Sequence, residues 1–157
     1  QSWTSIGAAG LRDDGRMHVE LIDHRPGTAW VTDRLLELQG RWKPLGIFAH
    51  EESTIRVLFD DFDAAGVAVE RMKTGQYVTA CGQLLQKVVA RRLRHRGQPE
   101  VNGALAGARA SDVGDGGWKW NRRSSSVDIS PLVVVTLAAW GHANAPEPAL
   151  AKPVFWG

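Results

Sequence analysis

The distribution of apolar and polar positions in the first 25 residues predicts a β-hairpin. Residues 2–9 are mostly small and apolar, and the segment MHVELID (Met17–Asp23) carries an apolar residue at every second position. Such alternation is typical of a half-buried strand, and the Asp14-Gly15 pair between the two segments suits a turn that needs positive φ. The chain is therefore predicted to begin with two strands joined by a turn.

Three stretches of helical spacing follow, separated by two short apolar runs. The predicted helices begin near Thr28, Ser53 and Thr74. Thr28 and Ser53 can cap their helices with a hydroxyl group, and Gly66 closes the second helix. The runs LGIFA and VAVERM are predicted to be strands. The order of two strands and then alternating helices and strands predicts an α/β fold with helices packed on a sheet.

The last third of the chain contains a basic run, glycine-rich stretches and one apolar segment. If the tripeptide WKW is extended, Trp118 and Trp120 lie on the same side of a strand, where core packing is favoured over base stacking. Ser130-Pro131 followed by LVVVTLAAWG predicts a buried helix. Three prolines and several alanines after residue 141 indicate a tail, so the predicted units are a domain over 1–141 and a tail over 142–157.

Composition indicates one domain with a real core. The chain has 157 residues, 43% of them hydrophobic, and 19 Lys and Arg against 17 Asp and Glu, which is a slight basic excess of +2. One cysteine excludes an internal disulfide, no Cys/His spacing fits structural zinc, and no apolar run approaches the roughly 18 residues of a membrane span. The N-terminus has neither a secretory signal nor an initiating Met, so we expect a piece of a longer protein.

Asp128 is the most informative single residue. It lies two residues before the predicted start of the apolar helix and follows Arg122 and Arg123, so it can ligate a divalent cation beside a phosphate-binding rim. The plainer interpretation is an acid that is stabilised by the dipole at a helix start. Both interpretations stay open at the level of the sequence.

Three other features have a functional and a plain interpretation. His50, followed by Glu51 and Glu52, ends the LGIFA strand and can bind a metal, or it is a loop histidine beside solvated acids. The run Arg91–Arg96 can hold a nucleic-acid backbone, because guanidinium groups match phosphate oxygens, or it is a solvated helix end. Cys81 falls on the apolar face of its helix, which favours a core cysteine over a nucleophile.

Several long segments fit one known family in the same order along the chain. They are MHVELIDHRPGTAWVTDRLLEL, AAGVAVERMKTGQYVTACG, RLRHRGQP, GDGGWKWNRRSSSVDISPL and its continuation RSSSVDISPLVVVTLAAWG. These segments resemble the nuclease domain of large terminase subunits from tailed bacteriophages, particularly those of actinobacterial phages and prophages. The resemblance extends over roughly residues 1–142.

The resemblance implies an RNase H-like α/β fold, a mixed sheet flanked by helices. It also implies two divalent cations, Mg²⁺ or Mn²⁺, held by acids at strand ends and at the start of the last helix. Such a pair activates water and stabilises the leaving oxygen in phosphodiester cleavage. The implied partners are double-stranded phage DNA and, in the full family protein, an ATPase domain, a small terminase subunit and a portal. The implied location is the cytoplasm of the bacterial host, and the resemblance implies no membrane partner.

The chain departs from the family pattern at three positions. Asp128 matches the family's last acid, but the first acid belongs to a strand expected before QSWTSIG, so the first strand is predicted to be missing. The second acid is expected where this chain has His50, and Glu51 is the candidate substitute. Gln86 occupies a place where the family is expected to carry an Asp.

Two functions are predicted as alternatives. The first is a metal-dependent endonuclease that cuts concatemeric DNA during packaging, with Asp128 and His50 as catalytic residues and Asp128 and Glu51 as metal ligands. This chain by itself is predicted to be an incomplete endonuclease with weak activity or none. The second is a non-enzymatic prophage remnant or a DNA-binding scaffold fragment. The predicted DNA-binding residues are Arg91, Arg92, Arg94, Arg96, Arg122 and Arg123.

Overall fold

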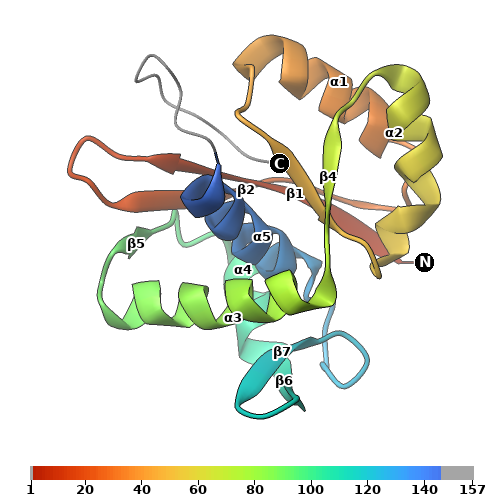
Figure 1. Cartoon of the computed structure of the whole chain (residues 1–157). Helices are drawn as coiled ribbons and strands as arrows, with labels where there is room; N and C mark the ends of the chain where they lie inside the picture. Colours follow the sequence, from red (N-terminus) through yellow and green to blue (C-terminus); the bar gives the residue numbers. More distant parts are fainter. Residues whose placement is uncertain (1, 146–157) are drawn as a thin grey trace.

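The alternating N-terminal segments form the two longest strands of the chain. The structure is a computed structural model and describes residues 2–145 (Figure 1). Strands β1 (Trp3–Leu11) and β2 (Met17–Pro26) pair antiparallel, with a register shift between Ile6 and Gly7. Gly15 takes φ of 79° in the connecting turn, a conformation that glycine adopts without steric cost. The predicted hairpin is confirmed.

The remaining elements alternate between helices and strands, as the apolar spacing predicts. They are α1 (Val31–Trp42), β3 (Ile47–His50), the 3-10 helix η1 (Thr54–Leu58), α2 (Phe59–Ala65), β4 (Val69–Met72), α3 (Thr74–Val89), β5 (Leu93–Arg94), α4 (Pro99–Gly107), β6 (Arg109–Val113), β7 (Gly117–Asn121) and α5 (Ser130–Asn144). The sequence analysis predicted none of α4, β5 and β6. The predicted domain boundary at residue 141 falls inside α5, and the tail from 146 onward lies outside the described residues.

Within residues 2–145 the strands form three groups. β2 lies between β1 and β5, with β5 parallel to it, while β3 and β4 form a parallel pair and β6 and β7 an antiparallel pair. Helices α1 and α2 pack against β3 and the start of β1, whereas α3 and α5 pack on the opposite side (Figure 1). The predicted α/β architecture, a mixed sheet flanked by helices, is confirmed.

Helix α5 packs against both β1 and β3. Its residues are apolar on every side, and ten of its positions are buried, as expected for a helix enclosed by the core. A methyl group added to Gly7 would meet Val134 at 2.9 Å, and one added to Gly141 would meet the Phe48 ring at 2.6 Å. These close approaches fix both strands against one helix.

Several local predictions hold, but two predicted side-chain caps are wrong. Cys81 is fully buried, and Trp118 and Trp120 lie on β7 and pack against the core with their ring centroids 4.9 Å apart. Thr28 does not cap α1 with its side chain, because Trp30 occupies the cap position and Thr28 contributes only a carbonyl to a preceding turn. The Ser53 hydroxyl donates to the His50 carbonyl and does not cap the 3-10 helix that follows. No helix within residues 2–145 is long and apolar enough to cross a membrane.

Candidate functional site

A cleft opens where β3 ends, between η1, the start of α3 and the β7 hairpin. Its cavity volume is about 490 Å³. Its lining residues are His50, Glu52, Ser53, Thr54, Tyr77, Lys119, Trp120, Asn121, Arg122, Arg123 and Val133. Strand ends in α/β sheets are common positions for binding sites, because loops from several elements meet there.

His50 forms the inner wall of this cleft and is 8% exposed. Its Nε2 lies 3.1 Å from the Thr74 hydroxyl, and its ring packs at 4.7 Å on Tyr77. Burial holds the pKa of His50 below its ordinary value; the charge of Glu52 opposes this shift, and the charge of Lys119 adds to it. The imidazole is therefore neutral at pH 7 and contributes no negative charge to a cation site.

Asp128 is exposed and is tied to the start of α5. Its Oδ1 accepts a hydrogen bond from the Ser130 backbone N–H at 2.7 Å. The Ser130 hydroxyl in turn bonds to the Ser5 hydroxyl at 2.7 Å, which joins the helix start to β1. The carboxylate thus satisfies one of the free N–H groups at a helix start, which is the plainer of its two interpretations.

The predicted metal ligands do not assemble into a metal site. Among residues 2–145, no three or more His, Cys, Asp or Glu side chains come together where they could hold a metal ion. Glu51 follows β3, with its backbone N–H bonded to the Met72 carbonyl. Two adjacent divalent cations need several carboxylates because they repel each other. The residues described here do not fit a two-metal centre.

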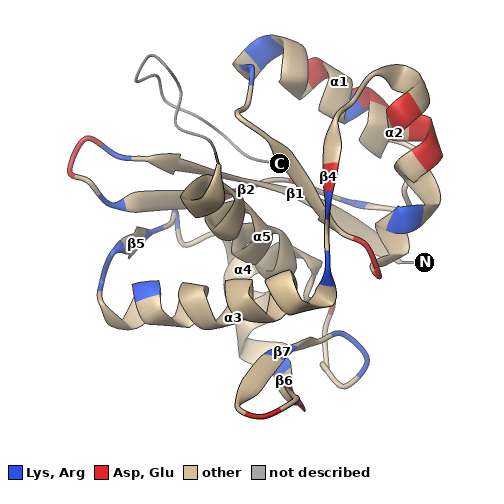
Figure 2. Cartoon of the chain, viewed as in Figure 1, with Lys and Arg blue, Asp and Glu red and all other residues tan. Residues whose placement is uncertain are grey.

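The six predicted DNA-binding arginines form two separate groups. Arg122 and Arg123 line the cleft together with Lys119, and none of these three forms an ion pair within the described part of the chain. The Arg91–Arg96 run lies beyond the far end of α3, a helix of 16 residues and so about 24 Å long. Figure 2 shows basic residues at β5 and, apart from these, in the loop after β7.

Arg96 differs from its neighbours in that run because its guanidinium is paired with Glu20 at 3.0 Å. This ion pair reduces the positive charge that Arg96 offers to a phosphate. We therefore distinguish a cleft group, Lys119, Arg122 and Arg123, from a distal group, Arg91, Arg92 and Arg94.

Sequence reasoning missed Lys119, Thr74 and Tyr77 as site residues. Lys119 was detectable, because the side chain between two core tryptophans on a strand points to the opposite face. The roles of Thr74 and Tyr77 beside His50 depend on how α3 packs against β3, which no local pattern reports. The thiol of Cys81 is excluded as a nucleophile, because burial raises its pKa and removes it from solvent.

The chain matches no family of the protein-family comparison and no curated protein. It is similar in structure to the large terminase of bacteriophage HK97, with a TM-score of 0.67 and 16% sequence identity. The similarity covers 90% of this chain and 39% of that protein, so this chain spans well under half of its structural neighbour. The likeness shows the fold, which is terminase-like and RNase H-like as predicted.

Proposed function

We propose that this chain is the nuclease-type portion of a phage terminase large subunit and that it binds double-stranded DNA across the cleft at the end of β3. The fold and the unpaired cations of the cleft group support this proposal. Three cations there face a single lining carboxylate, Glu52. Phosphate oxygens are suitable ligands for such a rim, and backbone contacts of this kind carry no sequence preference.

We further propose that the chain cuts DNA poorly or not at all by itself. Of the acids that the resemblance implies, Asp128 is engaged at the helix start and a neutral His50 replaces another. Hard cations such as Mg²⁺ prefer oxygen ligands, which makes an imidazole a poor substitute. The first acid of the family belongs to a strand that is not among the described residues. In a longer protein, that strand would be needed to complete a cleavage centre.

The binding proposal is tested by the salt dependence of duplex DNA affinity, measured by fluorescence anisotropy. The paired variants are Arg122→Ala/Arg123→Ala in the cleft group and Arg91→Ala/Arg92→Ala in the distal group. Each lost phosphate contact lowers the slope of log K against log salt by about 0.9. We expect the cleft variant to lower the slope by about 1.8 and the distal variant to lower it less. Equal losses, or affinity independent of salt, would contradict a cleft-centred interface.

The second proposal is tested by plasmid nicking in Mn²⁺. We expect no cleavage above background by the unmodified chain or by Asp128→Ala. Robust cleavage by the unmodified chain that disappears in Asp128→Ala would overturn the proposal and assign Asp128 to a working metal centre. His50→Asp serves as a further comparison, because restored cleavage would identify the missing carboxylate as the main defect.

A scaffold without enzymatic activity is the second candidate function. The hydrogen bond from Ser130 to Asp128 and the buried, neutral His50 favour it, because both residues have structural partners. This candidate makes the same DNA-binding prediction and differs in one outcome. A scaffold stays inactive after His50→Asp, even when the family's first strand is restored in a longer protein.

A further inference from the structure

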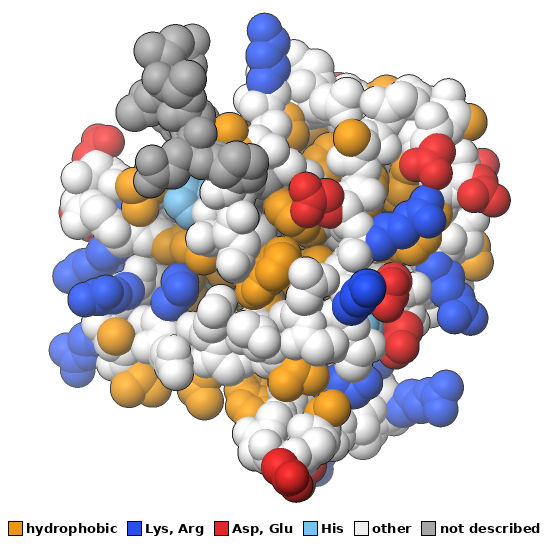
Figure 3. All heavy atoms as spheres, in the orientation of Figure 1, with side chains coloured by type: hydrophobic (Ala, Val, Ile, Leu, Met, Phe, Trp, Pro, Cys, Tyr) orange, Lys and Arg blue, Asp and Glu red, His pale blue; other side chains and the backbone are white. Residues whose placement is uncertain are grey.

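Trp3 is an aromatic side chain that remains open to solvent at the start of β1. It is 43% exposed, whereas the other large apolar side chains that are exposed within residues 2–145 are all aliphatic. Three of these, Leu85, Val88 and Val89, belong to α3, where Figure 3 shows hydrophobic side chains along the helix edge. Among the exposed apolar side chains in the described part of the chain, only Trp3 therefore offers a flat ring.

The indole of Trp3 is held in place by His24 on the neighbouring strand. The two rings stack with their centroids 4.6 Å apart and their planes 20° from parallel. They lie on the same face of the hairpin, because Ser5 is paired with His24 in the register of β1 and β2 and Trp3 comes two residues before Ser5. A ring that is already oriented loses less conformational freedom when it binds a second flat group.

Hydrogen bonds connect this stacked pair of rings to the start of α5. The Ser5 hydroxyl lies 2.8 Å from Nδ1 of His24 and 2.7 Å from the Ser130 hydroxyl. The Ser130 backbone N–H donates to Asp128 at 2.7 Å. Trp3 is therefore connected, through a continuous chain of contacts, to the acid that matches the last acid of the terminase family.

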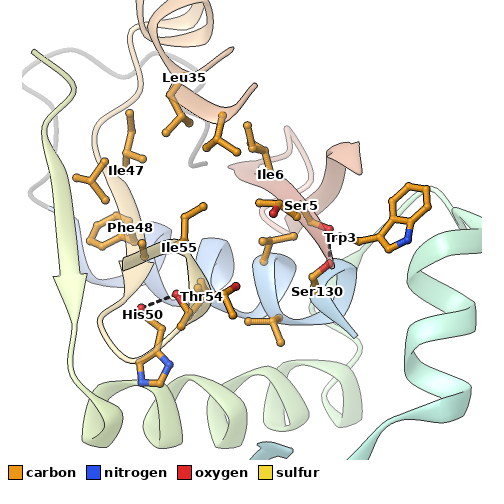
Figure 4. A pocket seen from close by; sticks show the side chains of 18 of the residues that line it. Trp3, Ser5, Ile6, Leu35, Ile47, Phe48, His50, Thr54, Ile55 and Ser130 are labelled. Atoms are coloured by element: carbon orange, nitrogen blue, oxygen red, sulfur yellow. Dashed lines mark hydrogen bonds between the residues drawn. The ribbon is translucent and has the colours of Figure 1, made fainter. Parts of the chain in front are cut away.

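Trp3 also lies beside the cleft that carries Arg122. A small cavity of about 80 Å³ has Trp3, Ser130 and Arg122 among its lining residues. This cavity and the cleft have several lining residues in common, namely His50, Ser53, Thr54, Arg122 and Val133. Figure 4 shows Trp3 at one side of the cavity, with its indole projecting away from the other labelled side chains. The surface that carries the cleft group therefore continues to an exposed aromatic ring.

We propose that Trp3 forms a subsite for an unpaired nucleobase beside the DNA cleft. Bases stack on aromatic side chains, and every base has a π-face, so such a subsite has little sequence preference. The cleft group supplies cations for the phosphates next to that base. A base inside a duplex is already stacked and paired, so the subsite takes a base from a single-stranded extension. This inference rests on the proposed DNA binding and adds a substrate class to it, duplex DNA with a single-stranded extension.

The probe is a fluorescent duplex with three unpaired nucleotides at one end, titrated into the full chain and followed by anisotropy, with 3′ and 5′ extensions tested separately. The control DNA keeps the three sugar-phosphate units of the extension but lacks their bases, so its charge is the same and only stacking is removed. The protein variants are Trp3→Ala, Trp3→Phe and Leu11→Ala. Leu11 is 59% exposed and lies at the other end of β1, so it is a matched control.

We expect the unmodified chain and Leu11→Ala to bind at least one extended DNA about fivefold or more tightly than its abasic control. Trp3→Ala should reduce this ratio to less than twofold, and Trp3→Phe, which keeps a ring, should retain part of it. In the unmodified chain, the indole N–H resonance of Trp3, assigned by its absence from Trp3→Phe, should shift with the extended DNA more than with the abasic control. This measurement tests the proposal even if Trp3→Ala unfolds the protein.

Two results would overturn the subsite. The first is equal affinity for the extended and abasic DNA, or no binding of either. The second is a preference for bases that Trp3→Ala leaves unchanged, because the base would then stack on another residue. A blunt duplex separates this inference from the proposed function. Salt-dependent binding of the blunt duplex with no gain from the bases refutes the subsite alone, whereas binding of the extended DNA without binding of the blunt duplex refutes the duplex interface alone.

Discussion

The close approach of α5 to β3 gives a quantitative test of the core. A methyl group at Gly141 would lie 2.6 Å from two carbons of the Phe48 ring, a separation that side-chain carbons essentially never show. Phe48 is buried and also packs edge-on against Trp140, so its ring has little room to move. Overpacking of a core by one methyl group costs about 1–3 kcal/mol. Gly141→Ala should therefore destabilise the packing between α5 and β3.

Gly82→Ala is the matched control, because Gly82 also lies within a helix and a methyl group there meets nothing within 4 Å. Replacing Gly by Ala in a helix interior stabilises it by about 0.8–1.0 kcal/mol. We expect Gly82→Ala to raise the free energy of unfolding by about that amount. Gly141→Ala should gain a similar stabilisation from helix propensity but lose stability from overpacking. The Gly141→Ala variant should therefore be less stable than the Gly82→Ala variant by about 1–3 kcal/mol.

The assay is urea unfolding followed by circular dichroism, with both variants and the unmodified chain at one pH. The variant Phe48→Leu provides a double-mutant cycle, since a smaller side chain should reduce the cost of Gly141→Ala by 0.5 kcal/mol or more, which is about the lower limit for residues in contact. Equal stability of Gly141→Ala and Gly82→Ala would refute the tight contact between α5 and β3.

Three further outcomes follow from the geometry of the site. Asp128→Ala should lower the free energy of unfolding by about 1 kcal/mol, because the Ser130 N–H loses its acceptor. Asp128→Asn keeps an acceptor oxygen and should keep most of that stability, and urea unfolding measures both variants. Because burial lowers the pKa of His50, this side chain takes up a proton in the unfolded protein at a higher pH than in the folded protein, so the free energy of unfolding should fall as the pH drops through about 6.5. His50→Gln should flatten that fall in urea titrations at several pH values. An unchanged slope would remove His50 as a cause. Cys81 should react with a thiol reagent at least tenfold more slowly in native protein than in denaturant, and equal rates would contradict its burial.

Local sequence patterns were enough to predict the fold class and most of the elements. A run of small apolar residues indicated β1, period-two alternation indicated β2, helical spacing indicated α1 to α3, and the start signal at Ser130-Pro131 indicated α5. These patterns are local, because the positions that face the core recur every two or every three to four residues. The two-residue strand β5, the short strand β6 and the small-residue helix α4 carry weak or no periodicity, which explains why they were missed.

Packing between elements determines which of the predicted site residues lie together. The arginines appeared as one rim in the sequence, but the length of α3 separates the distal group from the cleft group. His50 was expected at a strand end, and its neutrality arises from burial against Tyr77 on α3. The hydrogen bond from the Ser130 N–H to Asp128 is local, and the metal role of Asp128 stays a prediction. The separation of the arginines and the burial of His50 depend on packing between segments distant in sequence, and residue spacing within one element carries no information about that packing.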